Sequence, residues 1–86
     1  MGAAIRRSAA QGLIRMARGG DGEATRILAE NLAQFPDGEI GQSIRDGLAR
    51  LTHPSSRDAL WAVWQKTRHP EFERLAIQIG EPASEN

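Results

Sequence analysis

The chain contains no cysteine, no tyrosine, and only two tryptophans and two phenylalanines among its 86 residues. Without cysteine there is neither a disulfide framework nor a thiolate metal site, and nothing marks a small secreted protein. No segment approaches the roughly 20 apolar residues that span a bilayer, and the N-terminus lacks the apolar stretch of a secretory signal. These absences predict a cytoplasmic protein that has no membrane partner.

The chain also lacks a net charge, because 11 basic residues balance 11 acidic ones. This balance removes the overall attraction to nucleic acid or to an anionic membrane that a strongly basic domain has. The charges are unevenly distributed, since residues 1–20 carry four arginines and no acid, while the rest carries seven basic and eleven acidic groups. Ten of the eleven basic residues are arginine, a bias that is typical of GC-rich genomes and indicates a bacterial source.

Strand patterns are missing as well. No segment alternates apolar and polar residues with the two-residue period of a strand, and β-branched residues are sparse. Apolar residues instead recur at three- and four-residue steps, which is helical spacing. We therefore predict an all-α fold of five short antiparallel helices, or six if the first helix, expected over residues 3–18, breaks near Gln11 and Gly12. The helices are expected to form a single domain over residues 1–80, with a disordered tail at residues 81–86.

Two His-Pro steps, His53-Pro54 and His69-Pro70, mark the last helix boundaries. Proline lacks a backbone donor and disfavours helical geometry in the preceding residue, yet it suits the first helical position. Each step is therefore expected to close one helix and open the next. Asp21 is expected to cap the second helix, and Ser55 with Asp58 approximates a capping box for the fourth.

The apolar stripes predict which side chains form the core. The fourth helix is apolar around more than half of its circumference, so we expect it to be the central element, buried between neighbours on two sides. Gly47 lies beside the stripe of the third helix, where a missing side chain would let a neighbouring helix approach closely. The expected core residues, helix by helix, are Ile5, Ala9, Leu13, Met16 and Ala17; Ala24, Ile27, Leu28, Leu32 and Phe35; Ile40, Ile44, Leu48 and Leu51; Ala59, Leu60, Ala62, Val63 and Trp64; and Phe72, Leu75, Ala76 and Ile79.

The segment LTHPSSRDAL, residues 51–60, resembles the corner of a HEAT-like repeat, where a proline follows a helix end and a charged residue precedes the next apolar run. The stretch over residues 59–80 is similar to helical repeats that accompany larger bacterial multidomain proteins. HEAT repeats normally carry an aspartate and an arginine inside the turn, which Arg57 and Asp58 only approximate. The resemblance implies an α-solenoid fragment that presents a surface to other proteins and has no catalysis of its own.

Two further observations bear on the architecture. An internal echo at a spacing of 34 or 35 residues relates Pro36 to Pro70 and Leu28 to Val63, as a repeat would. The length of the chain is similar to that of the death-fold superfamily, whose members are antiparallel bundles of about six short helices. That second resemblance implies a compact bundle and homotypic assembly, which the opposite charges of the two ends of the chain would suit.

No residues form a constellation able to do chemistry, so we expect no enzyme activity, no catalytic residue, no cofactor and no metal. His53 and His69 supply at most two of the three or four ligands that a zinc site needs. Tryptophan is enriched in interaction hot spots, and the three-residue step places Trp61 at the edge of the fourth helix, beside a buried Trp64. The candidate partner-binding residues form one surface, the Trp61 region together with the first helix, and they are Trp61, Arg57, Arg68, Arg6, Arg7 and Arg15.

These observations predict a non-catalytic protein–protein interaction or scaffolding module of a larger bacterial assembly, with a protein partner of unknown identity. The first alternative is a death-fold-like adaptor that assembles by homotypic self-association. The second is a small all-α nucleic-acid-binding domain that uses the basic first helix for phosphate contacts, although the zero net charge disfavours a nucleic-acid partner.

Overall fold

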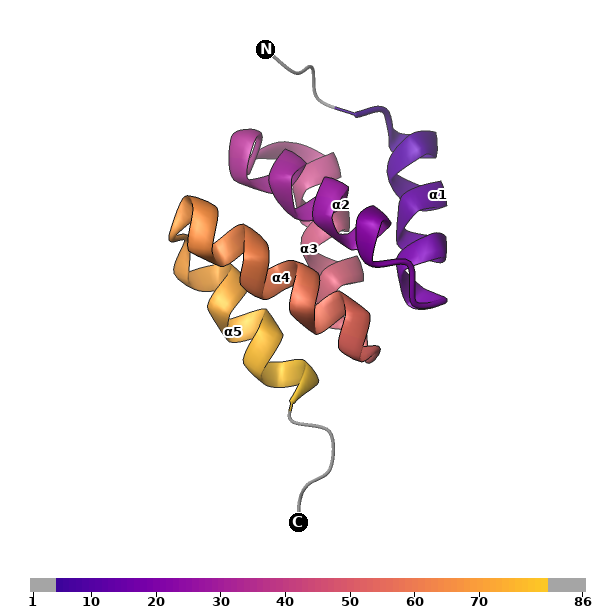
Figure 1. Ribbon diagram of the computed structural model, residues 1–86. Helices are drawn as coiled ribbons and strands as arrows, with labels where there is room; N and C mark the ends of the chain where they lie inside the picture. Colours follow the sequence, from indigo (N-terminus) through magenta and orange to yellow (C-terminus); the bar gives the residue numbers. More distant parts are fainter. Residues whose placement is uncertain (1–4, 81–86) are drawn as a thin grey trace.

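Five α-helices and no strand make up residues 5–80, the part of the chain that the computed structural model describes (Figure 1). The helices are α1 (Arg7–Arg18), α2 (Gly22–Gln34), α3 (Gly38–Ala49), α4 (Pro54–Thr67) and α5 (Pro70–Ile79). The all-α prediction is therefore confirmed. The first helix runs unbroken through Gln11 and Gly12, so the described residues contain five helices and not six. The tail predicted over residues 81–86 lies outside the described residues.

The local rules for helix ends place most boundaries correctly. Pro54 and Pro70 occupy the first positions of α4 and α5, and the histidine before each has an extended backbone, as predicted. The Asp21 carboxylate accepts a hydrogen bond from the Ala24 N–H at 3.1 Å, so the predicted cap of α2 is confirmed. The first helix starts later than expected because Arg6, at φ −76° and ψ 160°, is its extended N-cap.

The capping box predicted at Ser55 does not form. The N-cap of α4 is His53, and the Ser55 hydroxyl donates a hydrogen bond to the Gly20 carbonyl oxygen at 2.6 Å instead. Gly20 has a φ of +105°, and a Cβ placed on it would lie 3.1 Å from Nδ1 of His53. The turn between α1 and α2 therefore packs directly on the corner between α3 and α4.

Contacts between α1 and α3 show that these helices run in the same direction. Arg7, at the start of α1, forms an ion pair with Glu39, at the start of α3. Near the other end of both helices, Ile14 packs against Gly47 so closely that a Cβ on the glycine would lie 2.9 Å from the isoleucine Cγ1. The close approach expected at Gly47 is thus confirmed.

Two further pairs of neighbouring helices are also parallel. Along α2 and α4, Thr25 pairs with Ser56 near both helix starts and Glu30 pairs with Lys66 further along, so these two helices are parallel. Between α3 and α5, the corresponding pairs are Arg45 with Glu71 and the Ala49 carbonyl with Gln78. Helices α1, α3 and α5 therefore run one way, and α2 and α4 run the other way.

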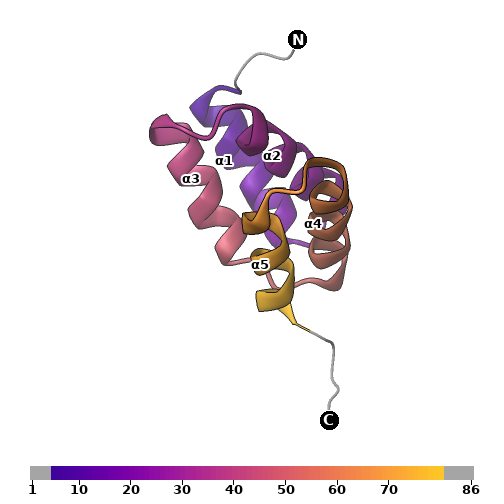
Figure 2. The same cartoon turned by 90° about the vertical axis from the view of Figure 1, so that its left-hand side faces the viewer.

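Helix α2 is the centre of the molecule, because it packs against α1, α3 and α4. The prediction that α4 is central is wrong, although α4 does pack on two sides, against α2 and α5. The physical reason is burial: α2 carries five buried residues and α4 carries three. Helices α3 and α4 scarcely touch, and Figure 2 shows them at opposite edges of the molecule with α5 between them. The radius of gyration, 12.1 Å, matches the roughly 12 Å expected for a compact chain of this length.

The predicted buried faces of α3 and α5 are largely confirmed, and the face predicted for α1 is correct only in part, since Ala17 is buried and Ile5 and Leu13 pack against the core. Ala10 and Ala17 are its buried residues, Ala9 is exposed, and the side chain of Met16 is 51% exposed. Insertion of Ile14 against the bare backbone of Gly47 turns α1 so that the side carrying Ala10 and Ala17 faces the core. The buried side of α1 therefore overlaps the predicted stripe at Ala17 and differs from it by burying Ala10 in place of Ala9.

Two hydroxyls lie in the core between α2 and α4, and the sequence analysis missed both. Thr25 and Ser56 are fully buried, and their side-chain oxygens are 3.0 Å apart. The Thr25 hydroxyl also donates a hydrogen bond to the Asp21 carbonyl oxygen at 3.3 Å, which leaves its oxygen free to accept from Ser56. Because both hydroxyls have partners, neither carries the cost of an unsatisfied buried polar group.

Candidate protein-interaction surface

Two tryptophans on α4 form the most distinctive feature of the molecular surface. The rings of Trp61 and Trp64 meet edge to face, with centroids 5.6 Å apart, and both side chains are partly buried against the core. Trp64, which was expected in the buried stripe, packs against the core but is only partly buried, and the partial exposure expected at Trp61 is confirmed. Trp64 stays at the margin because Leu60 and Val63 already fill the buried side of α4.

Arg68 adds a cation to this pair of rings. Its guanidinium carbon lies 4.6 Å from the centroid of the Trp64 ring, which is cation–π distance. Arg68 ends α4 in the left-handed region, at φ 61°, and it is the single non-glycine residue with a positive φ among the described residues. The guanidinium of Arg68 therefore lies over Trp64, the tryptophan nearer the end of α4.

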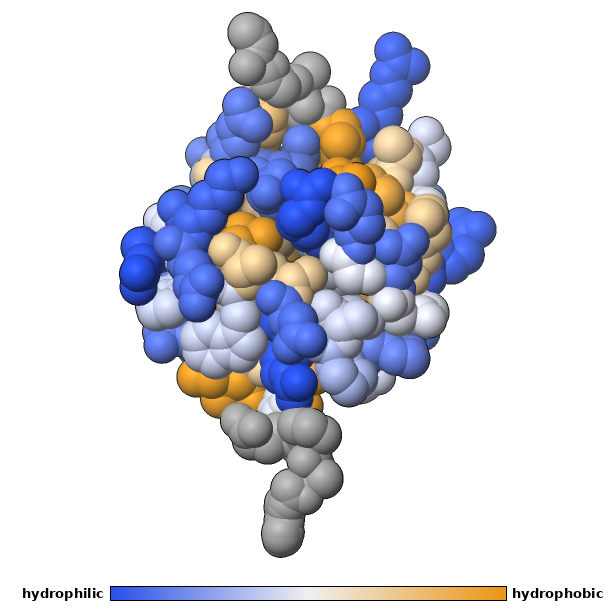
Figure 3. All heavy atoms as spheres, viewed as in Figure 1, coloured by the Kyte–Doolittle hydropathy of each residue, from blue (hydrophilic) through white to orange (hydrophobic). Residues whose placement is uncertain are grey.

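Ile77 extends the apolar area onto α5. Helices α4 and α5 are antiparallel, and Arg57 at the start of α4 donates a hydrogen bond to the Gly80 carbonyl oxygen at the end of α5. One turn further along α4 is Trp61, and one turn back along α5 is Ile77, whose side chain is 60% exposed. Figure 3 shows exposed hydrophobic atoms over α5, at the lower left of the molecule. We call Trp61, Trp64, Arg68 and Ile77 the α4–α5 surface.

Arg57 stabilises the arrangement of α4 and α5 beside this surface. Its side chain is only 19% exposed, its guanidinium donates to the Gly80 carbonyl at 2.9 Å, and it pairs with Asp58 at 3.5 Å. These contacts tie the end of α5 to the start of α4. A residue held in this way positions the surface and offers little of its own charge to a partner.

The arginines of the first helix lie apart from the tryptophans. Arg6 and Arg15 are exposed and form no ion pair among the described residues, whereas Arg7 is bound to Glu39. Helix α1 packs on α2 and α3 and makes no substantial contact with α4, so α2 separates the two groups (Figure 1). The candidate residues that were expected to form one surface therefore lie on two.

A trough along the seam between α1 and α3 is a feature that the sequence analysis missed. Three adjoining cavities make it up: the first and second share Arg7 and Glu39, and the second and third share Gln11 and Ser43. We call this feature the α1–α3 trough. No local pattern indicates it, because it exists only when two helices that are not consecutive lie side by side in parallel.

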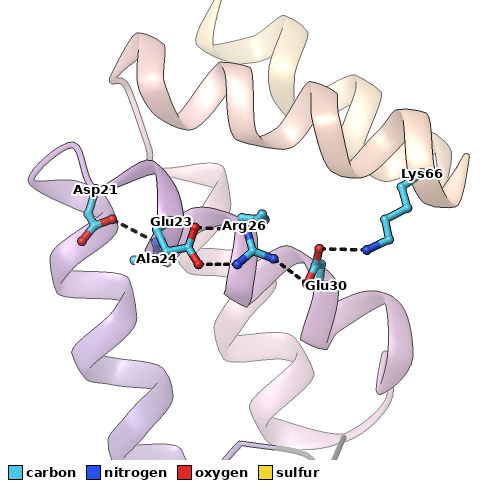
Figure 4. A network of polar contacts seen from close by, with 6 residues as sticks. All are labelled: Asp21, Glu23, Ala24, Arg26, Glu30 and Lys66. Carbon is cyan, nitrogen blue, oxygen red and sulfur yellow. Dashed lines mark hydrogen bonds and ion pairs between the residues drawn. The ribbon is translucent and has the colours of Figure 1, made fainter. Parts of the chain in front are cut away.

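The densest polar network is structural. On the outer side of α2 and α4, Arg26 binds Glu23 and Glu30, and Glu30 also binds Lys66 of α4 (Figure 4). The hydrogen bond from Arg26 holds the pKa of Glu23 below its ordinary value, and the two carboxylates together raise the pKa of Arg26. These charges satisfy one another, so the network links two helices and leaves no group poised for chemistry.

The two histidines take up the corner positions expected of them but do not cap helices with their side chains. His53 packs beside Gly20, and the His69 ring meets Phe72 edge to face at 5.9 Å. Within residues 5–80, no three metal-ligating side chains come together, and no helix is long and apolar enough to cross a membrane. No protein-family model, curated protein or solved structure matches the chain. The functional argument therefore depends on the surfaces themselves.

Proposed function

We propose that this chain is a protein–protein interaction module that docks a partner protein through the α4–α5 surface. The observation that carries the proposal is the pair Trp61 and Trp64, whose large rings remain partly in solvent beside the exposed Ile77. Water contact with so much apolar area is unfavourable, and its removal is the main driving force of protein association. Tryptophan and arginine are also the residues most enriched in binding hot spots.

The conformation of Arg68 supports this proposal. A left-handed backbone costs a non-glycine residue about 1–2 kcal/mol, so a glycine at this helix end would be favoured by stability alone. The arginine places a cation over Trp64 at the margin of the exposed rings. Strained residues of this kind cluster at functional sites, where the cost is offset by what the side chain does.

The order of the helices supports a HEAT-like module as the form of this interaction domain. The hairpins α2–α3 and α4–α5 follow each other along the chain, α2 packs on α4, α3 contacts α5, and each of these pairs is parallel. Stacked helical hairpins with equivalent helices side by side are the arrangement of α-solenoids. The lack of cysteine and the dominance of arginine over lysine support a module of the bacterial cytoplasm, working within a larger assembly.

The test is affinity capture with variants of the full chain, read by quantitative mass spectrometry. We expect a partner retained by the wild type to be lost at least tenfold by Trp61→Ala. The variant Ile77→Glu, at a position with 60% exposure, should lose the same partner without disturbing the core. The matched control is Ala62→Ser on the exposed side of α4. Equal capture by all four proteins would overturn the proposal.

Self-association is the second candidate, and one observation favours it. The two large apolar side chains with the highest exposure, Met16 and Ile77, lie on the first and last helices, where copies could meet end to end. Light scattering after size exclusion at two salt concentrations separates this death-fold-like behaviour from partner docking. A stable monomer at both concentrations would exclude it. A shift of unrelated DNA in a gel would instead support the nucleic-acid alternative.

A further inference from the structure

The α1–α3 trough is long, open and chemically polarised. Its three cavities have volumes of about 400, 420 and 260 Å³ and follow one another along the two helices. The first cavity offers the apolar side chains of Phe35 and Ile40, although Asp37 and the ion pair of Arg7 with Glu39 also line it. The last is lined by Arg18 and Arg50, so the other end is basic.

The arginines at the basic end have no counter-ion in the described part of the protein. Arg18 and Arg50 are both exposed and form no ion pair there. The nearest acid that lines the same cavity, Asp46, accepts a hydrogen bond from Gln42 at 3.2 Å. Two arginines against this one carboxylate give the end a net positive charge that an acidic ligand would neutralise.

The middle of the trough is lined by uncharged hydrogen-bonding groups. Gln11 of α1 and Ser43 of α3 face the space from its two sides, and both residues are exposed. Amide and hydroxyl groups donate and accept, which suits the alternating N–H and C=O groups of an extended backbone. At the basic end, Ile14 and Gly47 also line the cavity, and Ile14 packs directly against the bare backbone of the glycine.

The dimensions fit a short peptide. Helices α1 and α3 have 12 residues each, which at about 1.5 Å per residue gives a seam of roughly 18 Å. An extended chain covers about 3.3 Å per residue, so five or six residues fill the seam. A small metabolite would leave most of this open trough empty. A nucleic acid would carry phosphates along the whole seam, beside Glu39 and Asp46 as well, whereas a peptide needs carboxylates only at the end that holds Arg18 and Arg50.

We propose that the α1–α3 trough binds an extended acidic peptide segment of a partner protein. Its carboxylates pair with Arg18 and Arg50, its backbone bonds to Gln11 and Ser43, and an apolar side chain enters the cavity beside Phe35. This surface lies away from the α4–α5 surface, with α2 between them, so the two proposed binding sites share no residue.

The test uses the full chain and a phage-displayed library of random octapeptides, followed by fluorescence polarisation with the selected peptides made synthetically. We expect selected peptides to combine aspartate or glutamate at one end with leucine, phenylalanine or tryptophan about four to six residues away. Ser43→Trp fills the middle of the trough and should raise the Kd at least tenfold. The same substitution at Ser8, an exposed position of α1, is the matched control and should leave the Kd unchanged.

Charge provides the second arm of the test. The double variant Arg18→Gln with Arg50→Gln should weaken binding about tenfold and remove most of its salt dependence, because the peptide carboxylates lose their partners. Arg74→Gln, at an exposed arginine of α5, should have no effect. Failure to select any peptide, or peptides whose affinity survives Ser43→Trp, would overturn the proposal. Peptides that survive Ser43→Trp but are lost with Trp61→Ala would locate binding at the α4–α5 surface instead.

Discussion

At the scale of single residues, the helical glycines Gly12 and Gly47 differ in whether the structure has room for a side chain. A Cβ on Gly47 would lie 2.9 to 3.1 Å from three carbons of Ile14, whereas nothing lies within 4 Å of the corresponding position on Gly12. Isoleucine is stiff about χ1, so it has little freedom to move aside. The packing of α1 against α3 requires glycine at position 47. Gly12 has no such role and only lowers the helix propensity of α1.

We therefore expect opposite effects from the same substitution. Gly47→Ala should lower the free energy of unfolding by about 1–2 kcal/mol, because the clash with Ile14 exceeds the gain in helix propensity. Gly12→Ala should raise it by about 0.5–1 kcal/mol. Urea denaturation followed by circular dichroism measures both. A stabilised Gly47→Ala would mean that α1 and α3 do not approach each other as closely as the structure shows.

The buried hydroxyl pair supplies a second prediction at this scale. Thr25→Val leaves the Ser56 hydroxyl without its partner, so it should cost about 1–3 kcal/mol. Adding Ser56→Ala removes the unsatisfied group, so the double variant should be less destabilised than the sum of the two single variants. The measurement is a double-mutant cycle of unfolding free energies. Strict additivity would show that the two hydroxyls do not depend on each other.

At the scale of the helices, the two aspartates at N-cap positions differ in what they do. The Asp21 carboxylate accepts a bond from the Ala24 N–H, while Asp37, the N-cap of α3, makes no side-chain capping bond. Two aspartates at the same N-cap position therefore differ in how much they stabilise their helices. The backbone angles of the two aspartates differ, with ψ at 103° for Asp21 and at 159° for Asp37.

Alanine substitution should expose this difference. Asp21→Ala should destabilise the protein by about 1 kcal/mol, the usual effect of losing a helix cap. Asp37→Ala serves as the control and should change the stability by less than about 0.5 kcal/mol. Thermal unfolding at constant pH and salt reports both values. An equal loss in the two variants would contradict the capping assignment.

At the scale of the whole molecule, stability is unevenly shared among the helices. The buried residues of α1 are both alanines, whereas α2 buries five residues and contacts three other helices. Small side chains bury little area, so less free energy holds α1 in place. We therefore expect α1 to be the helix that opens with the smallest free energy.

Native-state hydrogen exchange provides the measurement. Amides of α1 should exchange through local opening, with clearly lower protection than the amides around Leu28 in α2, which should exchange only on global unfolding. Gly47→Ala should lower protection in α1 further and leave the ranking of the other helices unchanged. Uniform protection across all five helices would show that the chain opens only as a unit.

The sequence predicted what local chemistry decides, including the helix type, the prolines at the first positions of α4 and α5, and the Asp21 cap. It failed where distant parts of the chain decide. The buried side of α1 depends on the contact between Ile14 and Gly47. The Ser55 hydroxyl donates its hydrogen bond to the Gly20 carbonyl oxygen and does not cap α4. The α1–α3 trough forms between two helices that α2 separates in the sequence. Arg18 and Arg50 become candidate binding residues only because the fold brings them to the same cavity. Trp61 was identified in advance because residue type alone marks it.

The common direction of α1, α3 and α5 has a mechanical consequence. Helix α1 starts at one end of the molecule and α5 finishes at the opposite end, so tension applied through these ends acts along the helix axes (Figure 1). Such a load shears the packed side chains past one another and does not peel one helix away at a time. Because α1 buries only two alanines, its contacts with α2 and α3 should be the first to yield under such a load.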